Sequence, residues 1–206
     1  MLEHTQLGLR RIGVVLLVVL ATVTALIAAD PAMARHERTI TFEGLYPSVT
    51  WDELAAAADA VVEVAVVGPP TSRWNSRDGQ EWKSDDPFAR PLVHSYWPVV
   101  IDRVHSGTLS PGELDVRLPG GTVGDVLMVI DHAPVLAKGD QVLMLLDYRK
   151  WPVEGGYEYG WSPHWMNRGV FRASEGGEWR NDDAGIVVTA DEFRHAMTTR
   201  SDGSEE

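Results

Sequence analysis

The chain has 206 residues, no cysteine, and 30 Asp and Glu against 18 Lys and Arg, so its net charge is −12 at pH 7. The missing cysteine excludes disulfides, thiolate chemistry and attachment of a lipid through a thiol. The acidic balance argues against nucleic acid as a partner, because its phosphates would be repelled. We attribute this charge to solubility, with a basic partner or divalent cations as alternatives.

The first 34 residues carry the pattern of an export signal. Arg10 and Arg11 precede a stretch without charge, residues 12–29, which is followed by a proline and the small-x-small triplet that ends at Ala34. This order predicts a signal peptide cut after Ala34 and a secreted, extracytoplasmic protein. The alternative is an uncleaved anchor, because a helix over 12–29 would rise about 27 Å, close to the ~30 Å hydrocarbon layer. The chain would then contact the membrane only through residues 12–29.

Hydrophobic periodicity predicts strands joined by turns rich in glycine and proline, with two short helices. A strand is expected at 39–42, and the others at 61–67, 93–104, 114–118, 126–130, 142–146, 169–173 and 185–189. Thr50 with Glu53, and Thr189 with Glu192, form capping boxes that open the two helices. The even-numbered valines of 61–67 should face the core, and 142–146 should be the most buried strand. We expect one hairpin over 114–130 and irregular structure over 148–165.

These elements predict a single mainly β domain over 35–200, followed by an acidic tail at 201–206. Pro98 interrupts the strand at 93–104, which implies an edge, a bulge or a bend such as a barrel corner. The expected architecture is therefore a small antiparallel, OB-like β-barrel with two peripheral helices, preceded by an N-terminal hydrophobic helix.

Five segments resemble a group of uncharacterised exported bacterial proteins that are built on a small OB-like β-barrel. The matching segments are 58–62 with the run to Gly68, 100–104, 118–121, 139–143 and 169–172. The resemblance covers most of residues 50–175 and implies the barrel fold without any activity or site residue. The segment between the first two strands is longer here than in that group.

That long segment, 69–91, is the first candidate for function, because loops beyond about 12–15 residues are usually functional or disordered. Arg77-Asp78-Gly79 predicts a three-residue hairpin turn with Gly79 in the left-handed region. This turn would place Trp74 opposite Trp82 on a small ribbon. The two rings would then pack on the domain or form a platform for a sugar or a peptide, with disorder of the segment as the third interpretation.

A second group of aromatic residues is the other candidate. It comprises Trp151, Tyr157, Tyr159, Trp161 and Trp165, with His164 nearby. Such rings either close the end of a barrel or stack on carbohydrate, and their exposure decides between the two. The candidate ligand-binding residues are therefore Trp74, Trp82, Trp161 and Trp165.

Neither a catalytic nor a cofactor motif stands out. The seven histidines lack the spacing of a metal site, and the glycine-rich segment 120–124 lacks the lysine of a phosphate-binding loop. We therefore expect no metal, no cofactor and no covalent chemistry. The expected function is binding of a protein partner at the cell envelope. The alternatives are binding of a cell-wall glycan through the tryptophans, and a hydrolase whose site assembles only on folding.

Overall fold

The computed structural model describes residues 38–43, 48–84 and 90–202. They lie within one compact unit, Glu37–Glu206. The predicted export signal, its cut after Ala34, the hydrophobic helix over 12–29 and most of the acidic tail lie outside the described residues.

The described residues form strands, two helices and one short 3-10 turn. The strands are β1 (Arg38–Phe42), β2 (Ala60–Val66), β3 (Thr71–Trp74), β4 (Val93–Ser106), β5 (Gly112–Pro119), β6 (Gly121–Val123), β7 (Val126–Ile130), β8 (Gln141–Val153), β9 (Gly156–Pro163), β10 (Val170–Ala173), β11 (Trp179–Asn181) and β12 (Ile186–Val188). The helices are α2 (Trp51–Ala57) and α3 (Ala190–Asp202), and the 3-10 turn η2 is Met166–Gly169.

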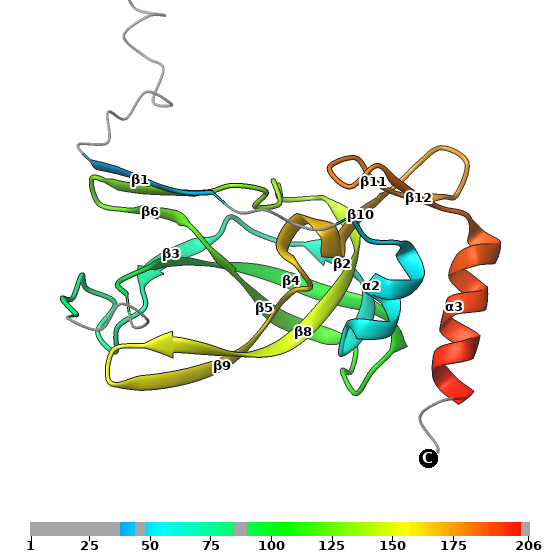
Figure 1. Cartoon of the computed structure of the whole chain (residues 1–206), viewed down its shortest axis with the longest axis horizontal. Coiled ribbons are helices and arrows are strands. Elements are labelled where there is room, and N and C mark those ends of the chain that lie inside the picture. The colour runs from blue at the N-terminus through cyan, green and yellow to red at the C-terminus, as the bar shows by residue number, and fades with distance from the viewer. Residues whose placement is uncertain (1–37, 44–47, 85–89, 203–206) are drawn as a thin grey trace, which may run out of the picture. The chain divides into compact units, whose positions relative to one another are not determined.

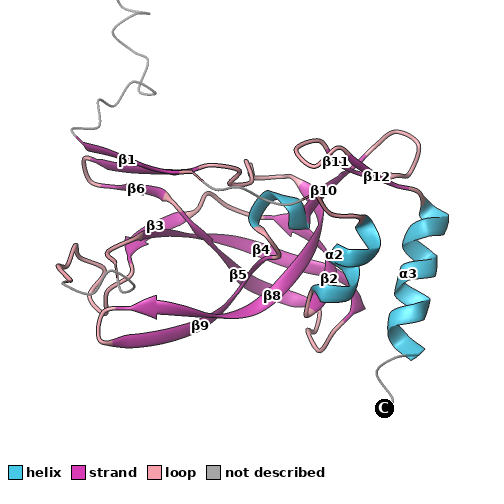
Figure 2. Ribbon diagram, viewed as in Figure 1, coloured by secondary structure: helices cyan, strands magenta, loops and turns pink. Residues whose placement is uncertain are grey.

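The strands assemble into two sheets (Figure 1, Figure 2). One has three strands in the order β1-β7-β6. The other has nine, in the order β12-β11-β10-β8-β2-β4-β3, with β5 paired to β4 and β9 paired to β8. Strands β1 and β7 pair in parallel, and the other described pairs are antiparallel. The prediction of a mainly β domain with two helices is thus confirmed.

The larger sheet curls without closing. Five of its strands follow one another in the order β5-β4-β2-β8-β9, and the outer edges of β5 and β9 come together in space. No ladder of backbone hydrogen bonds joins these two edges among the described strands. The expected closed barrel is therefore wrong, because a barrel needs a continuous ladder around its circumference.

The central strands are buried on both faces. The even-numbered residues of β2 and β8, such as Val62 and Met144, belong to one hydrophobic cluster, and the odd-numbered Val61 and Leu143 belong to a second. Both helices contribute to the second cluster. Residues 142–146 are at most 1% exposed, so the predictions of inward even valines and of a buried 142–146 strand are confirmed.

Both predicted capping boxes form. The hydroxyl of Thr50 accepts from the Glu53 amide while the Glu53 carboxylate accepts from the Thr50 amide at 2.8 Å. Thr189 and Glu192 make the same reciprocal pair at the start of α3. Each box satisfies amide groups that have no partner within the helix.

Pro98 lies inside β4 at a change of partner. On one side of β4, β3 pairs as far as Tyr96 and β2 pairs from Val99 onward. The proline therefore stands between two neighbouring strands, where neither requires the missing N–H.

The expected hairpin over 114–130 is wrong in its pairing. Strand β5 pairs with β4, and only the short β6 folds back on β7. The chain leaves the larger sheet at Gly120 and Gly121, whose φ angles are 98° and 125°. A Cβ at Gly121 would lie 2.2 Å from the Ser95 hydroxyl oxygen, so only glycine lets β6 turn away this close to β4.

Gly169 marks the tightest backbone approach beside β8 and offers a test of this packing. A Cβ there would lie 2.6 Å from the carbonyl oxygen of His164 and 2.8 Å from that of Leu145. Gly169→Ala should lower the free energy of unfolding by about 1–3 kcal/mol or more, because backbone atoms must shift. Urea denaturation measures the change.

Gly156→Ala is the matched control. A Cβ at Gly156 meets no atom within 4 Å and the backbone is not left-handed, so the change should stay within about 0.5 kcal/mol. Equal urea midpoints for the two variants would contradict the close approach at Gly169.

Candidate functional site

The segment 148–165, expected to be irregular, instead forms most of a long hairpin. Strand β8 continues to Val153, turns through Gly155 at φ 71°, and returns as β9. In the register, Tyr148 stands opposite Trp161 and Trp151 stands opposite Glu158. Because side chains alternate along a strand, these two pairs lie on opposite faces of the hairpin.

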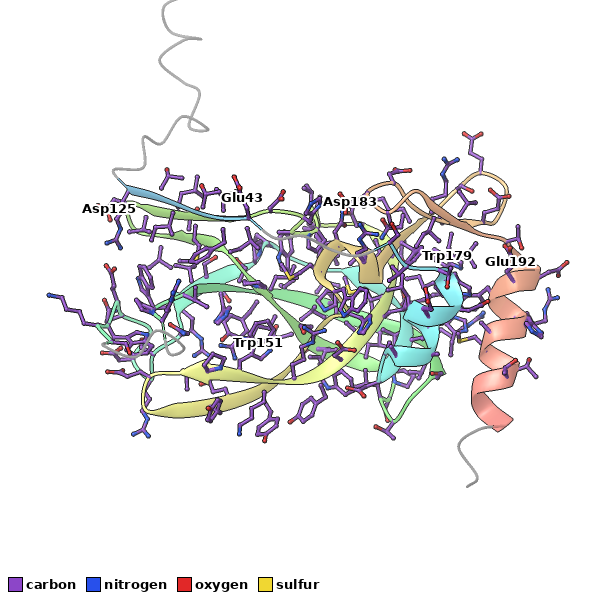
Figure 3. The ribbon with its side chains drawn as sticks, viewed as in Figure 1. Glu43, Asp125, Trp151, Trp179, Asp183 and Glu192 are labelled. Carbon is purple, nitrogen blue, oxygen red and sulfur yellow. The ribbon has the colours of Figure 1, made fainter. Side chains whose placement is uncertain are left out.

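The inner face of the hairpin, which carries Trp151, packs against β4 and β5 (Figure 3). The Trp151 ring lies edge-on to His94 at 5.2 Å, and the Arg117 guanidinium lies 5.3 Å from the centre of the same ring. Near the hairpin turn, the Asn75 side-chain amide donates to the Pro152 carbonyl at 3.1 Å. These contacts fix the far end of the hairpin on the rest of the domain.

Arg117 joins the two strand edges that no backbone ladder joins. Its side chain is only 3% exposed, and one guanidinium nitrogen lies 3.2 Å from a Glu158 carboxylate oxygen. A second nitrogen donates to His94 Nδ1 at 2.7 Å. Gly160 lies beside the Arg117 side chain, since a Cβ there would be in ordinary van der Waals contact with its Cδ at 3.9 Å. An ion pair thus bridges β5 and β9 where a closed barrel would have backbone hydrogen bonds.

The His94 ring is neutral in this network. Burial, together with the positive charges of Arg117 and Arg73, lowers the pKa of His94 to about 3. Nδ1 can then accept the hydrogen bond from Arg117, which places the ring proton on Nε2. Burial also lowers the pKa of Arg117, and the interactions with Tyr96 and Glu158 offset only part of this shift.

The outer face of the hairpin carries exposed aromatic side chains. Tyr148, Tyr157 and Tyr159 are 53%, 62% and 59% exposed. The Tyr148 ring stacks on Tyr159 with centres 5.7 Å apart and planes 23° apart, and it lies 5.2 Å from the ring of Trp161. We call these four residues, Tyr148, Tyr157, Tyr159 and Trp161, the aromatic face.

A first hollow, of about 650 Å³, opens beside the aromatic face. It is lined by Asp59, Thr108, Tyr148 and Trp161. One Asp59 carboxylate oxygen accepts from the Tyr148 backbone amide at 2.7 Å, which fixes the carboxylate next to the ring. The hollow therefore combines two aromatic rings with a carboxylate and a hydroxyl.

A second hollow, of about 400 Å³, lies at the junction of β5 and β9. Its lining residues are Arg73, Tyr96, Asp115, Arg117, Glu158, Tyr159 and Gly160. The Arg73 guanidinium lies 4.6 Å from the centre of the Tyr96 ring and 3.9 Å from the Glu158 carboxylate. Tyr159 belongs both to this hollow and to the aromatic face.

The structure separates the four tryptophans proposed from the sequence. Trp74 is buried and pairs across the sheet with Val93, so the expected cross-strand pair with Trp82 does not form. Trp82 is half-buried and donates from Nε1 to Asn75 at 2.8 Å. Gly79 does adopt the expected left-handed conformation, with φ 75°. The ribbon is absent because β3 pairs with β4, a strand that lies beyond the turn.

Trp161 and Trp165 also lie in different surroundings. Trp161 joins the aromatic face and packs against the first hydrophobic cluster, whereas Trp165 stacks on the His164 ring at 5.3 Å and packs against the second. Sequence reasoning missed Tyr148, Asp59 and Arg117. Aromatic residues alternate at 157, 159 and 161, directly after Gly155-Gly156. This pattern indicates a hairpin strand with one aromatic face.

A buried acid–histidine pair lies elsewhere. His164 Nδ1 lies 2.8 Å from an Asp147 carboxylate oxygen. Burial alone would raise the pKa of Asp147, but hydrogen bonds from His164 and Arg149 hold this pKa below its usual range. A hydrolase would also need a nucleophile on the other ring nitrogen. No hydroxyl group of the described residues forms a hydrogen bond with that nitrogen.

No group of three His, Asp or Glu side chains that could hold a metal ion occurs in the described part of the chain.

An apolar hollow of about 550 Å³ lies between the two sheets. Trp97, Leu118, Leu127 and Ile130 are among its lining residues, and Val129 and Val135 at its rim are exposed. It contains neither a charged side chain nor a stacked ring pair among its described lining residues.

Comparisons with protein-family models, with curated proteins and with solved structures found no match to this chain. Neither of the two described helices has the length and hydropathy required to span a membrane.

Acid denaturation tests the neutral His94. The unfolded chain takes up a proton on this residue below about pH 6.5, whereas the folded chain does so only near pH 3. The contribution of His94 to stability is therefore complete above about pH 6.5 and is lost as the pH falls toward 3. When the pH is lowered from about 7 to about 4.5, the free energy of unfolding of His94→Gln should fall by roughly 2–3 kcal/mol less than that of the native protein. Glutamine keeps an acceptor for Arg117 without titrating.

Urea denaturation at the two pH values measures this difference. His195→Gln, on the exposed side of α3, serves as the control and should lose as much stability as the native protein. An unchanged acid sensitivity in His94→Gln would show that the buried ring is not the titrating group.

Proposed function

We propose that this domain is an exported, non-catalytic binding module and that its aromatic face holds a glycan of the cell envelope. The observation that carries the proposal is the exposed ring stack of Tyr148 and Tyr159, which continues to Trp161 and ends at the hollow with Asp59.

Exposed rings of this kind suit a sugar. The apolar side of a sugar ring can stack on an aromatic face, while its hydroxyl groups need acceptors and donors at the edge. Asp59 supplies a fixed carboxylate acceptor and Thr108 supplies a hydroxyl beside the rings. A ligand that is apolar on one side and polar at its edge therefore matches the first hollow.

Trp161 packs against the first hydrophobic cluster, but Tyr148 and Tyr159 belong to no hydrophobic cluster of the described residues. The outer ends of Tyr148 and Tyr159 remain in water, and the hairpin is held by Trp151, Arg117 and Asn75 on its other face. Exposed, nearly parallel rings that pack on one another are better explained by ligand contact than by closure of a barrel end.

An envelope protein is the second candidate ligand. The exposed Val135, with 82% of its surface in water, and Val129 border the apolar hollow between the sheets and favour a protein contact there. The two candidates place the ligand on different residues, so one experiment separates them.

The test is retention of the purified domain on insoluble cell-wall polysaccharide and, separately, on immobilised envelope proteins. Tyr148→Ala should weaken binding to the polysaccharide roughly tenfold, because the stack with both Tyr159 and Trp161 is lost. Val187→Ala, which removes an exposed apolar side chain on β12, is the control and should bind as the native protein does. Circular dichroism checks that both variants are folded.

Two outcomes would contradict the glycan proposal. One is retention on envelope protein with none on polysaccharide, accompanied by loss of binding in Val135→Ala. The other is retention on polysaccharide that Tyr148→Ala leaves unchanged.

Export is tested by the intact mass of the protein from whole cells. Cleavage after Ala34 should give a mature chain that begins at Arg35. A mass that includes residues 12–29 would instead indicate the anchored form, and recovery from the cytoplasm would refute export.

A further inference from the structure

We infer that the two hollows beside the aromatic face are the ends of one binding track and that its ligand is an uncharged polysaccharide chain occupying both. This inference rests on the proposed glycan-binding function and adds the length and the charge of the ligand.

The track is continuous through ring contacts. Trp161 and Tyr148 line the first hollow, Tyr148 stacks on Tyr159, and Tyr159 lines the second hollow. No lining residue is shared by the two hollows, so each has its own polar groups. A single sugar would use one hollow, whereas a chain that lies along the rings would reach both.

The second hollow is held in a fixed geometry before any ligand arrives. Glu158 is placed by Arg117 at 3.2 Å and by Arg73 at 3.9 Å. Arg73 in turn lies over the Tyr96 ring and donates to its hydroxyl at 3.3 Å. Fixed acceptors of this kind lose little conformational entropy when they bind hydroxyl groups.

The charges at the two ends argue against an acidic ligand. The carboxylate of Asp59 lies in the first hollow, and those of Asp115 and Glu158 lie in the second. The second hollow also holds Arg73 and Arg117, so its charges cancel, and the more buried Arg117 already faces Glu158. The whole chain carries a net charge of −12. An anionic polymer would therefore meet carboxylates at both ends, whereas neutral hydroxyl groups find acceptors there.

The test measures affinity by titration calorimetry with neutral glucan, mannan and galactan oligomers, each from the monosaccharide to the hexasaccharide, and with the acidic polymer polygalacturonate. For at least one neutral series we expect affinity to rise with chain length until both hollows are filled. This binding should change little with salt, because the ligand carries no charge to be screened. Polygalacturonate should bind more weakly than any neutral polymer that binds.

Asp115→Asn localises the second end of the track. The change keeps the shape of an exposed side chain that forms no ion pair with the described residues, so the fold should be preserved. It should weaken hexasaccharide binding roughly tenfold and leave the shortest bound oligomer unaffected, because only the long ligand reaches this hollow. Glu154→Gln, an exposed change at the hairpin turn that also removes one negative charge, is the matched control and should leave both affinities unchanged.

The outcomes separate this inference from the proposed function. Affinity that is independent of chain length, or an Asp115→Asn variant with native hexasaccharide binding, would overturn the track while glycan binding at Tyr148 stands. Tighter binding of polygalacturonate, weakened by salt, would overturn the uncharged ligand. Failure of every glycan to bind would overturn both proposals.

Discussion

The arrangement of this domain depends on how β5 and β9 are joined. Two sheet edges that come together without a ladder would leave backbone groups unpaired, and the structure places the buried Arg117 between them instead. A buried guanidinium is costly unless its charge and its donors are matched. Glu158 supplies the charge, a neutral His94 accepts one hydrogen bond, and Tyr96 and Trp151 lie against the cation. The match is incomplete, because the buried Nε of Arg117 has no hydrogen-bond partner among the described residues.

This bridge determines which face of the hairpin meets water. The side chains that contact Arg117 occupy the inner positions of β8 and β9, so the alternation of the strands turns Tyr148 and Tyr159 outward. The same anchoring holds the outer rings in place without burying them. The aromatic face is thus a consequence of the way side chains join β5 and β9. Because its rings are already held in place, the proposed ligand would lose little entropy in ordering them.

Features that depend on neighbours in sequence were predictable, and features that depend on partners in space were not. The capping boxes at Thr50 and Thr189 and the shared face of the even-numbered valines of β2 follow from local spacing alone. The way in which β5 and β9 are joined does not follow from local spacing, because it depends on an ion pair between Arg117 and Glu158, which are 41 positions apart. The same limit explains Trp74, whose strand partner Val93 lies beyond the 69–91 segment.

The candidate site shows the same division. Composition alone indicates Trp161, whereas Tyr148 reaches the Trp161 ring because β8 extends past the buried run 142–146. Trp165 is the same residue type and lies only four positions further along the chain. Its left-handed backbone nevertheless directs the ring onto His164 and away from the aromatic face. Residue type indicated the aromatic side chains as candidates, and strand register determines which of them are exposed.

The most direct measurement of the central claim is an NMR titration of the aromatic side-chain signals with the neutral oligosaccharide that binds best. The account predicts that the ring signals of Tyr148, Tyr159 and Trp161 shift with a common affinity, while those of the buried Trp74 and of Trp165 stay in place. Shifts confined to residues around Val129 and Val135, or unchanged signals of Tyr148 and Tyr159 at saturating ligand, would contradict it.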